Sequence, residues 1–269
     1  MERTAIADGY LAALGLARAE PTPAMLGEIT RRHVATFAFS SIGPRLGDEL
    51  PLDVASLYDR IVVRRRGGYC FEQNGLLFEV LQELGYPVHL YLARVIHNQD
   101  THPPLTHRVT VVDLGEDRLV VDVGFGPLGP PWPVPLSGSS TGEAGRAFRV
   151  TEPRPGEFHM QTVKEGAPYS LYRFEVARYG QADCEVGHFY SHRHPGATFV
   201  NNLVASVIRD DEIRSLRNRE YWVLRASGDR VLPVDDATQL RDVLGDALGL
   251  RVTAEESRRL FDALPGPAT

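Results

Sequence analysis

The sequence predicts an α+β fold with an N-terminal helical bundle, a central antiparallel β-sheet closed into a small barrel or sandwich, and a smaller C-terminal α/β element. Three observations support this prediction. Apolar residues recur at helical spacing up to Leu84, short strand-like segments follow from residue 88, and strand-like and helical segments alternate after Phe199. We place the three parts at residues 1–84, 85–190 and 191–269.

The helical bundle is predicted from amphipathic stretches. Ile6, Tyr10 and Leu11 share one face of a first helix, and residues 25–33 and 57–62 repeat the same spacing. Gly85 follows the last apolar turn and Pro87 lies two residues further on, which is a common way to end a helix. The change from helix to strand is therefore expected at residue 85.

The central part is predicted from short segments rich in Val, Leu and Tyr, at residues 88–95, 108–114, 118–123, 148–150 and 171–176. Residues 127–135 hold five prolines and are expected to leave the sheet and re-enter it irregularly. In the C-terminal part, strands are expected at 221–225 and 230–233 and helices at 236–244 and 254–264.

Composition excludes several classes of function. The 269 residues carry a formal net charge of -6, which does not favour nucleic acid or an acidic membrane as partner. No segment resembles a secretory signal or a membrane-spanning helix. The two cysteines, Cys70 and Cys184, form no disulfide framework and belong to no C-x-x-C pair, so we expect a cytoplasmic protein without a metal site.

Cys70 is a candidate nucleophile. It follows Gly67-Gly68, which permits a sharp turn, and it lies in the first turn of the apolar helix that comes after them. At the start of a helix, unpaired backbone N–H groups and the helix dipole stabilise a thiolate and a developing oxyanion. The alternative is that Cys70 is a small buried hydrophobe, as most lone cysteines are.

His107 and Asp122 are candidates for the base and its orienting acid. A two-residue hairpin loop at Gly115-Glu116 would place the two side chains on the same face as diagonal neighbours, whereas a three-residue loop would separate them. Asp122 stands among valines, where an unpartnered carboxylate is costly. Cys70, His107 and Asp122 together predict a Cys-His-Asp core like that of cysteine proteases.

These motifs resemble those of the arylamine N-acetyltransferases, which transfer an acetyl group from acetyl-coenzyme A to aromatic amines and hydrazines. The resemblance covers nearly the whole chain. Its signatures are Arg66-Gly67-Gly68-Tyr69-Cys70-Phe71-Glu72-Gln73-Asn74, Leu92-Ala93-Arg94-Val95, Thr106-His107 and Val121-Asp122-Val123-Gly124-Phe125-Gly126, in that order.

The resemblance implies a helical bundle that carries Cys70, a β-barrel that carries His107 and Asp122, and a C-terminal α/β lid. It further implies that the coenzyme lies near four residues, namely Thr106, Gly124, Phe125 and Gly126. The acceptor pocket would be lined by Phe39, Val95, Phe125 and Phe199, for which core packing is the alternative. No permanently bound cofactor is implied, since acetyl-CoA is a substrate, and either a monomer or a homodimer is expected.

Arg66 departs from the family pattern. Relatives carry an acidic residue after the early helices that pairs with this arginine, but here the segment reads Phe39-Ser40-Ser41-Ile42. A buried guanidinium needs acceptors. We therefore expect a replacement carboxylate, with Glu72 the nearest candidate and Asp48 or Glu49 as others, unless Arg66 turns to solvent.

The favoured mechanism is ping-pong transfer through an acyl-Cys70 intermediate. Three alternatives stay open. The first is an ansamycin-type amide synthase that uses a polyketide thioester to form an amide or macrolactam. The second is a cysteine protease or transglutaminase-like hydrolase, and the third is a catalytically impaired binding protein.

Overall fold

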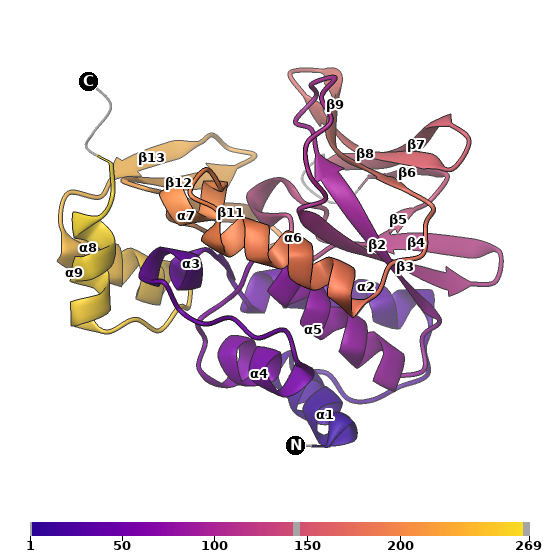
Figure 1. Cartoon of the computed structure of the whole chain (residues 1–269), viewed down its shortest axis with the longest axis horizontal. Helices are drawn as coiled ribbons and strands as arrows, with labels where there is room; N and C mark the ends of the chain where they lie inside the picture. The colour runs from indigo at the N-terminus through magenta and orange to yellow at the C-terminus, as the bar shows by residue number, and fades with distance from the viewer. Residues whose placement is uncertain (1, 142–145, 266–269) are drawn as a thin grey trace.

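A computed structural model of the chain describes residues 2–141 and 146–265. The N-terminal helices form one layer, an antiparallel β-sheet rises at one end of this layer, and a second sheet with its helices lies at the other end (Figure 1). Among the described residues, no helix combines the length and the apolar character needed to cross a bilayer. This mixture of helices and separate antiparallel sheets agrees with the predicted α+β class.

The N-terminal layer consists of α1 (Arg3–Ala13), α2 (Pro23–Thr36), α3 (Ile42–Leu46), α4 (Val54–Tyr58), η1 (Asp59–Val63) and α5 (Cys70–Glu83). Tyr10 and Leu11 of α1 pack in one apolar core with Leu76 and Leu77 of α5. Gly85 adopts a left-handed conformation after α5, with φ of 87°. The helix therefore ends where the sequence predicts.

The larger sheet has eight strands in the order β5-β4-β3-β2-β9-β8-β7-β6. Its two outermost strands, β5 and β6, contact each other, so the sheet is nearly closed into a barrel. The strands are β2 (Val88–Val95), β3 (His107–Leu114), β4 (Asp117–Val121), β5 (Val134–Pro135), β6 (Gly138–Thr141), β7 (Ala147–Arg154), β8 (Glu157–Lys164) and β9 (Ala167–Glu175).

The proline-rich residues 127–135 connect two neighbouring strands of this sheet. They contain the short helix η2 (Gly126–Leu128) at their start and the two-residue strand β5 at their end, where Val134 pairs with Val120. The segment thus leaves and re-enters the sheet as expected. Strands β6 and β8 were not predicted from the sequence.

The second sheet has five strands in the order β1-β10-β11-β12-β13. The strands are β1 (Phe39–Ser40), β10 (Val204–Ile208), β11 (Glu212–Arg217), β12 (Glu220–Arg225) and β13 (Arg230–Pro233). The helices α8 (Ala237–Asp242), η4 (Val243–Ala247) and α9 (Ala254–Asp262) pack beside it, and the core includes Leu216, Leu240 and Leu260.

Two features of the chain path correct the sequence prediction. The first 84 residues are not wholly helical, because Phe39 and Ser40 pair with Ser206 and Ala205 of the second sheet. Helix α6 (Gln181–Arg193), which the sequence did not predict, spans the boundary placed between residues 190 and 191, and the short helix α7 (Thr198–Asn201) follows. The two boundaries themselves, at 84/85 and 190/191, stay predictions.

Candidate active site

The turn before α5 is built from two glycines that nothing larger can replace. Gly67 has φ of 65°, and a Cβ atom there would lie 2.5 Å from the Ala38 carbonyl oxygen. A Cβ atom on Gly68 would lie 2.8 Å from Cβ of Glu72. The carboxylate of Glu72 accepts a hydrogen bond of 3.1 Å from the Tyr69 backbone N–H and caps the helix. Cys70 is consequently the first residue of α5, as predicted.

His107 and Asp122 meet across the hairpin of β3 and β4. Leu114 pairs with Asp117, so Gly115 and Glu116 form the two-residue loop on which the predicted register depends. The Nε2–H group of His107 donates a hydrogen bond of 2.7 Å to Oδ2 of Asp122. This interaction occupies Nε2 and leaves Nδ1 of the ring for a second partner.

Asp122 is held by three donors although it is almost fully buried, with 1% of its surface exposed. Its Oδ1 atom accepts hydrogen bonds from Asn74 Nδ2 at 2.8 Å and from the Gly124 backbone N–H at 2.9 Å. Asn74 Oδ1 also accepts from the Val123 N–H at 2.9 Å, so α5 is tied directly to the acid. No role was predicted for Asn74 itself, although it lies one helical turn after Cys70.

The electrostatics of the pair favour the charged forms. Burial lowers the pKa of His107, but the charge of Asp122, their hydrogen bond and the interaction with Cys70 outweigh burial and raise the pKa to about 10. Burial opposes ionisation of Asp122, yet His107, Asn74 and the Gly124 N–H together lower the pKa of its carboxyl. An imidazolium beside a carboxylate is thus the stable state at neutral pH.

Cys70 lies beside this pair and is 3% exposed. Its thiol is 3.4 Å from the Thr106 carbonyl oxygen, and its hydrogen bond with His107 contributes to the raised pKa of that ring. The first backbone N–H groups of α5 point toward the same end of the helix, where Glu72 and Gln73 both donate to the Tyr69 carbonyl. Within residues 2–141 and 146–265, the N–H groups of Cys70 and Phe71 have no acceptor, so both remain for an oxyanion.

Comparisons with known proteins agree with this geometry. A family model described as N-acetyltransferase matches residues 23–257. The arylamine N-acetyltransferase of Mycobacterium tuberculosis is 36% identical over 242 residues, which cover 87% of this chain and 84% of that protein. The chain belongs to the arylamine N-acetyltransferase family. It is therefore an acyltransferase.

Solved structures of the family have the same fold. The arylamine N-acetyltransferase of Mycobacterium marinum in complex with CoA matches with a TM-score of 0.88 and 30% identity, covering 95% of this chain and 98% of that one. The enzyme from Salmonella typhimurium matches with a TM-score of 0.90 and 25% identity over 96% and 98% of the two chains. The likeness thus extends through all three parts of the acetyltransferase.

The turn Gly124-Phe125-Gly126 of this acetyltransferase covers the start of α5. A Cβ atom on Gly124 would lie 2.7 Å from Cα of Cys70, and one on Gly126 would contact the ring of Phe39 at 3.6 Å. The ring of Phe125 meets His107 edge-on at 5.2 Å between centroids. The structure thus places Gly124 and the Thr106 carbonyl at Cys70, Phe125 at His107 and Gly126 at Phe39, and their role toward the coenzyme stays a prediction.

The predicted acceptor-pocket residues form an aromatic group with one outlier. Phe199 packs against Phe39 and Tyr69 with centroid distances of 5.7 Å and 5.0 Å. Val95 lies on β2 opposite Tyr172 of β9, whose ring packs on His107 at 4.8 Å. Val95 therefore belongs to the barrel side of the site, while Phe39 and Phe199 belong to the opposite side.

The sequence did not single out Tyr69 and His188, although these two residues join α6 to the nucleophile. The Tyr69 hydroxyl donates to Nδ1 of His188 at 2.5 Å, and Nε2–H of His188 donates to the Leu50 carbonyl at 2.7 Å. Burial lowers the pKa of His188 to about 4, so the ring stays neutral and keeps both bonds. The one signal in the sequence was that Tyr69 directly precedes Cys70.

Arg66 has a carboxylate partner, but this partner is not Glu72, the candidate nearest to it in the sequence. Its Nη1 donates to Glu256 Oε2 of α9 at 2.8 Å and to the Arg251 carbonyl at 2.9 Å, while Asp48 is 3.9 Å away. The prediction of Glu72 was wrong because Glu72 caps Tyr69 and pairs with Arg60 at 2.8 Å. Arg66 is 11% exposed, so it does not turn to solvent.

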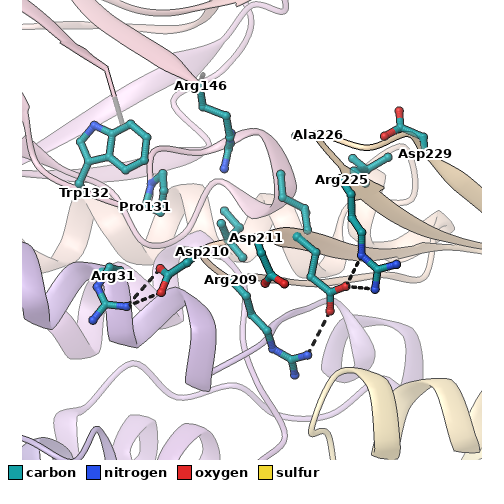
Figure 2. Close-up of a pocket in the computed structure, with 14 residues that line it drawn as sticks. Arg31, Pro131, Trp132, Arg146, Arg209, Asp210, Asp211, Arg225, Ala226 and Asp229 are labelled. Atoms are coloured by element: carbon teal, nitrogen blue, oxygen red, sulfur yellow. Dashed lines mark hydrogen bonds and ion pairs between the residues drawn. The ribbon is translucent and has the colours of Figure 1, made fainter. Parts of the chain in front are cut away.

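A cavity of about 480 Å³ lies apart from Cys70, between the β10–β11 hairpin and the segment around Trp132 (Figure 2). Its charges are largely paired with each other: Arg31 binds Asp210 at 2.8 Å, and Glu212 binds Arg225 and Arg209. A second cavity of about 700 Å³ lies between α5, β2 and residues 176–181. Neither cavity is lined by Cys70, His107 or Asp122.

Proposed function

We propose that this enzyme transfers an acetyl group from acetyl-CoA to an arylamine or hydrazine by a ping-pong mechanism, with Cys70 as the nucleophile. The observation that carries the proposal is the position of His107, between Cys70 at the first residue of α5 and Asp122 at 2.7 Å. In this arrangement Asp122 orients the ring and stabilises its protonated form.

In the first half-reaction, the Cys70 thiolate attacks the carbonyl carbon of the acetyl thioester. The oxyanion that develops is stabilised by backbone N–H groups at the start of α5. When the intermediate collapses, the bond to the sulfur of CoA breaks, and the departing thiolate takes the proton from His107. The products are acetyl-Cys70, neutral His107 and free CoA.

In the second half-reaction, the nitrogen of the amine attacks the carbonyl carbon of acetyl-Cys70. Neutral His107 accepts a proton from that nitrogen as the new amide forms. Cleavage of the carbon–sulfur bond returns the Cys70 thiolate beside the His107 imidazolium. The same three side chains therefore serve both steps.

Burial of the three residues supports transfer in preference to hydrolysis. Cys70, His107 and Asp122 are 3%, 2% and 1% exposed, and Phe125, Tyr172 and Phe199 pack around or near them. Exclusion of water protects an acyl-cysteine, because water competes with the amine for the same carbonyl carbon. We assign the coenzyme to the side of Thr106, Gly124, Phe125 and Gly126.

The acceptor is assigned to the aromatic side of the site. Phe39, Phe125 and Phe199 offer ring faces and edges that suit an aromatic amine, with Val95 on the barrel side. A complex of the Mycobacterium marinum relative with CoA supports the donor assignment. The likeness to an arylamine N-acetyltransferase over 87% of the chain supports placing acetyl transfer ahead of macrolactam formation.

The test is intact-protein mass spectrometry after mixing with acetyl-CoA in the absence of an amine. We expect an adduct of one acetyl group, located on Cys70 by peptide mapping, and no adduct in Cys70→Ala. Cys184→Ala is the matched control and should acquire the acetyl group normally. An adduct that persists in Cys70→Ala would refute the assignment, and absence of any adduct from the wild type would favour an impaired binding protein.

A further inference from the structure

Arg108 follows His107 directly on β3, so the two side chains point to opposite faces of the strand. Arg108 is 3% exposed, and its Nε atom is buried without a hydrogen-bond partner. Within residues 2–141 and 146–265, no Asp or Glu oxygen lies within 4.0 Å of its guanidinium. The charge is therefore buried without a carboxylate.

Two other shielded arginines, Arg60 and Arg66, each have a carboxylate partner. Arg60, which is 6% exposed, pairs with Glu72 at 2.8 Å, and Arg66 pairs with Glu256 at 2.8 Å. Arg108 instead lies over the ring of Phe78, with 5.0 Å between the guanidinium carbon and the ring centroid. A ring face leaves the in-plane N–H donors of the guanidinium without acceptors.

Arg108 lines the cavity of about 700 Å³ between α5, β2 and residues 176–181. Phe78 and Tyr179 supply aromatic wall, and Arg178 adds a second positive charge. The cavity also contains Glu79, but this acid pairs with Arg3 at 2.8 Å. The charge that remains for a ligand is therefore positive.

We propose that this cavity binds a small aromatic carboxylate, whose oxygens accept hydrogen bonds from Arg108 and whose ring packs on Phe78 and Tyr179. A carboxylate matches the planar fork of a guanidinium with two parallel hydrogen bonds. Burial of Arg108 strengthens such a pair, because the arginine is already desolvated before the ligand arrives. The site lies on the face of β3 opposite to His107.

The site shares backbone with the reaction centre without sharing side chains. The carbonyl of Arg108 accepts a hydrogen bond of 2.6 Å from Nδ2 of Asn74, the same atom that donates to Asp122. A ligand held by the Arg108 side chain thus lies on the opposite face of β3 from His107. Occupation of the cavity and acetylation of Cys70 are therefore separable by experiment.

The experiment is calorimetric titration of the full chain with benzoate, compared among the wild type, Arg108→Met and Arg230→Met. Arg230 is an exposed arginine of β13 and serves as the matched control. We expect saturable binding by the wild type and Arg230→Met, and at least tenfold weaker binding by Arg108→Met. Without benzoate, Arg108→Met should have a higher Tm than the wild type, because an unpaired buried charge is replaced by an apolar side chain.

A second variant guards against a simple failure to fold. Arg108→Lys keeps the charge but loses the planar fork, so it should bind benzoate more weakly than the wild type and more tightly than Arg108→Met. Equal binding by the wild type and Arg108→Met, or no binding by the wild type, would overturn the proposal. Binding that is lost when Cys70 is acetylated would place benzoate at the reaction centre and would overturn it as well.

Discussion

The two faces of β3 carry consecutive buried bases with opposite surroundings. His107 faces Asp122, whose two oxygens together accept hydrogen bonds from His107, Asn74 and the Gly124 N–H. Arg108 faces an aromatic ring and a cavity, without a carboxylate among the described residues. A built-in partner stabilises the charge of His107, which the proposed mechanism uses for proton transfer, whereas the proposed ligand site leaves the charge of Arg108 for an acceptor from outside. Burial alone thus says little about the role of a charged side chain, and its partners decide that role.

The largest effect on stability and on the reactivity of Cys70 is expected when Asp122, the carboxylate partner of His107, is removed. Asp122→Ala leaves the imidazolium, the Asn74 amide and the Gly124 N–H without their shared acceptor, which should cost about 3 kcal/mol of stability. The rate of Cys70 alkylation by iodoacetamide at neutral pH should fall at least tenfold, and His107→Gln should slow it similarly.

The control for Asp122→Ala is Asp117→Ala, which removes an exposed acid from the same strand. It should change neither the alkylation rate nor the free energy of unfolding by urea. If Asp122→Ala reacted as fast as this control, Asp122 would not belong to the triad.

The pH dependence of stability should report the same pair. The pKa of His107 is raised from 6.5 to about 10 in the folded enzyme, so its stabilisation is complete below pH 6.5 and is lost as pH rises through about 10. Each pKa unit corresponds to about 1.4 kcal/mol. We therefore expect the wild type to have a larger free energy of unfolding than His107→Gln at pH 6.5. This difference between the two proteins should shrink as the pH rises to 10.

In acid, the lowered pKa of Asp122 makes stability fall as the pH falls, which is opposite to the effect of His107 in base. Its contribution is present above the ordinary value of 3.8 and is lost as pH falls through the lowered value.

Parallel stability curves for the wild type and His107→Gln from pH 6.5 to pH 10 would contradict the pairing.

A smaller effect is expected at the contact between α9 and the turn before Cys70. Burial opposes ionisation of Glu256, yet the hydrogen bond from Arg66 lowers the pKa of its carboxyl. Glu256→Gln should cost about 1 kcal/mol of stability, because the pair is partly exposed, and should reduce acetyl transfer several-fold by loosening the turn at Gly67. Glu255→Gln changes the neighbouring first-turn acid and should have neither effect; equal behaviour of the two variants would remove the role given to Glu256.

The smallest effect is expected on the Arg108 face. Cys184 of α6 is fully buried, and burial raises the pKa of its thiol, although Arg108 opposes the shift. Cys184→Ala should keep acetyl transfer within about twofold of the wild type, since a buried protonated thiol is inert. Steady-state rates with matched protein concentrations measure this, and a large loss in a folded variant would bring Cys184 into the mechanism.

The sequence predicted what local rules determine. The start of α5 follows from Gly67-Gly68 and the helical spacing after it, and the His107–Asp122 pair follows from counting residues across a two-residue loop. Strand β1 was missed because its two residues pair with β10, more than 160 positions away. Glu256 was missed for the same reason, since it meets Arg66 from 190 positions away.

Other features were missed because their signals are weak or have two meanings. Glu72 was a reasonable partner for Arg66 by distance along the chain, but the capping position after Tyr69 and the buried Arg60 compete for the same carboxylate. Strand β11 carries Glu212, Arg214 and Arg217, and its two apolar residues, Ile213 and Leu216, lie on opposite faces, so the strand lacks the alternation of apolar and polar residues that predicts a strand. Contacts between residues far apart in the sequence, and competition between several groups for one carboxylate, cannot be predicted from local sequence rules.

The most direct test of the central claim uses isolated acetyl-enzyme. After incubation with acetyl-CoA and removal of all coenzyme by gel filtration, the protein is mixed with aniline and followed by mass spectrometry. Transfer through Cys70 predicts one equivalent of acetanilide per acetylated chain, together with return of the protein to its original mass. Acetanilide that forms only when acetyl-CoA is added back would contradict a covalent intermediate on Cys70.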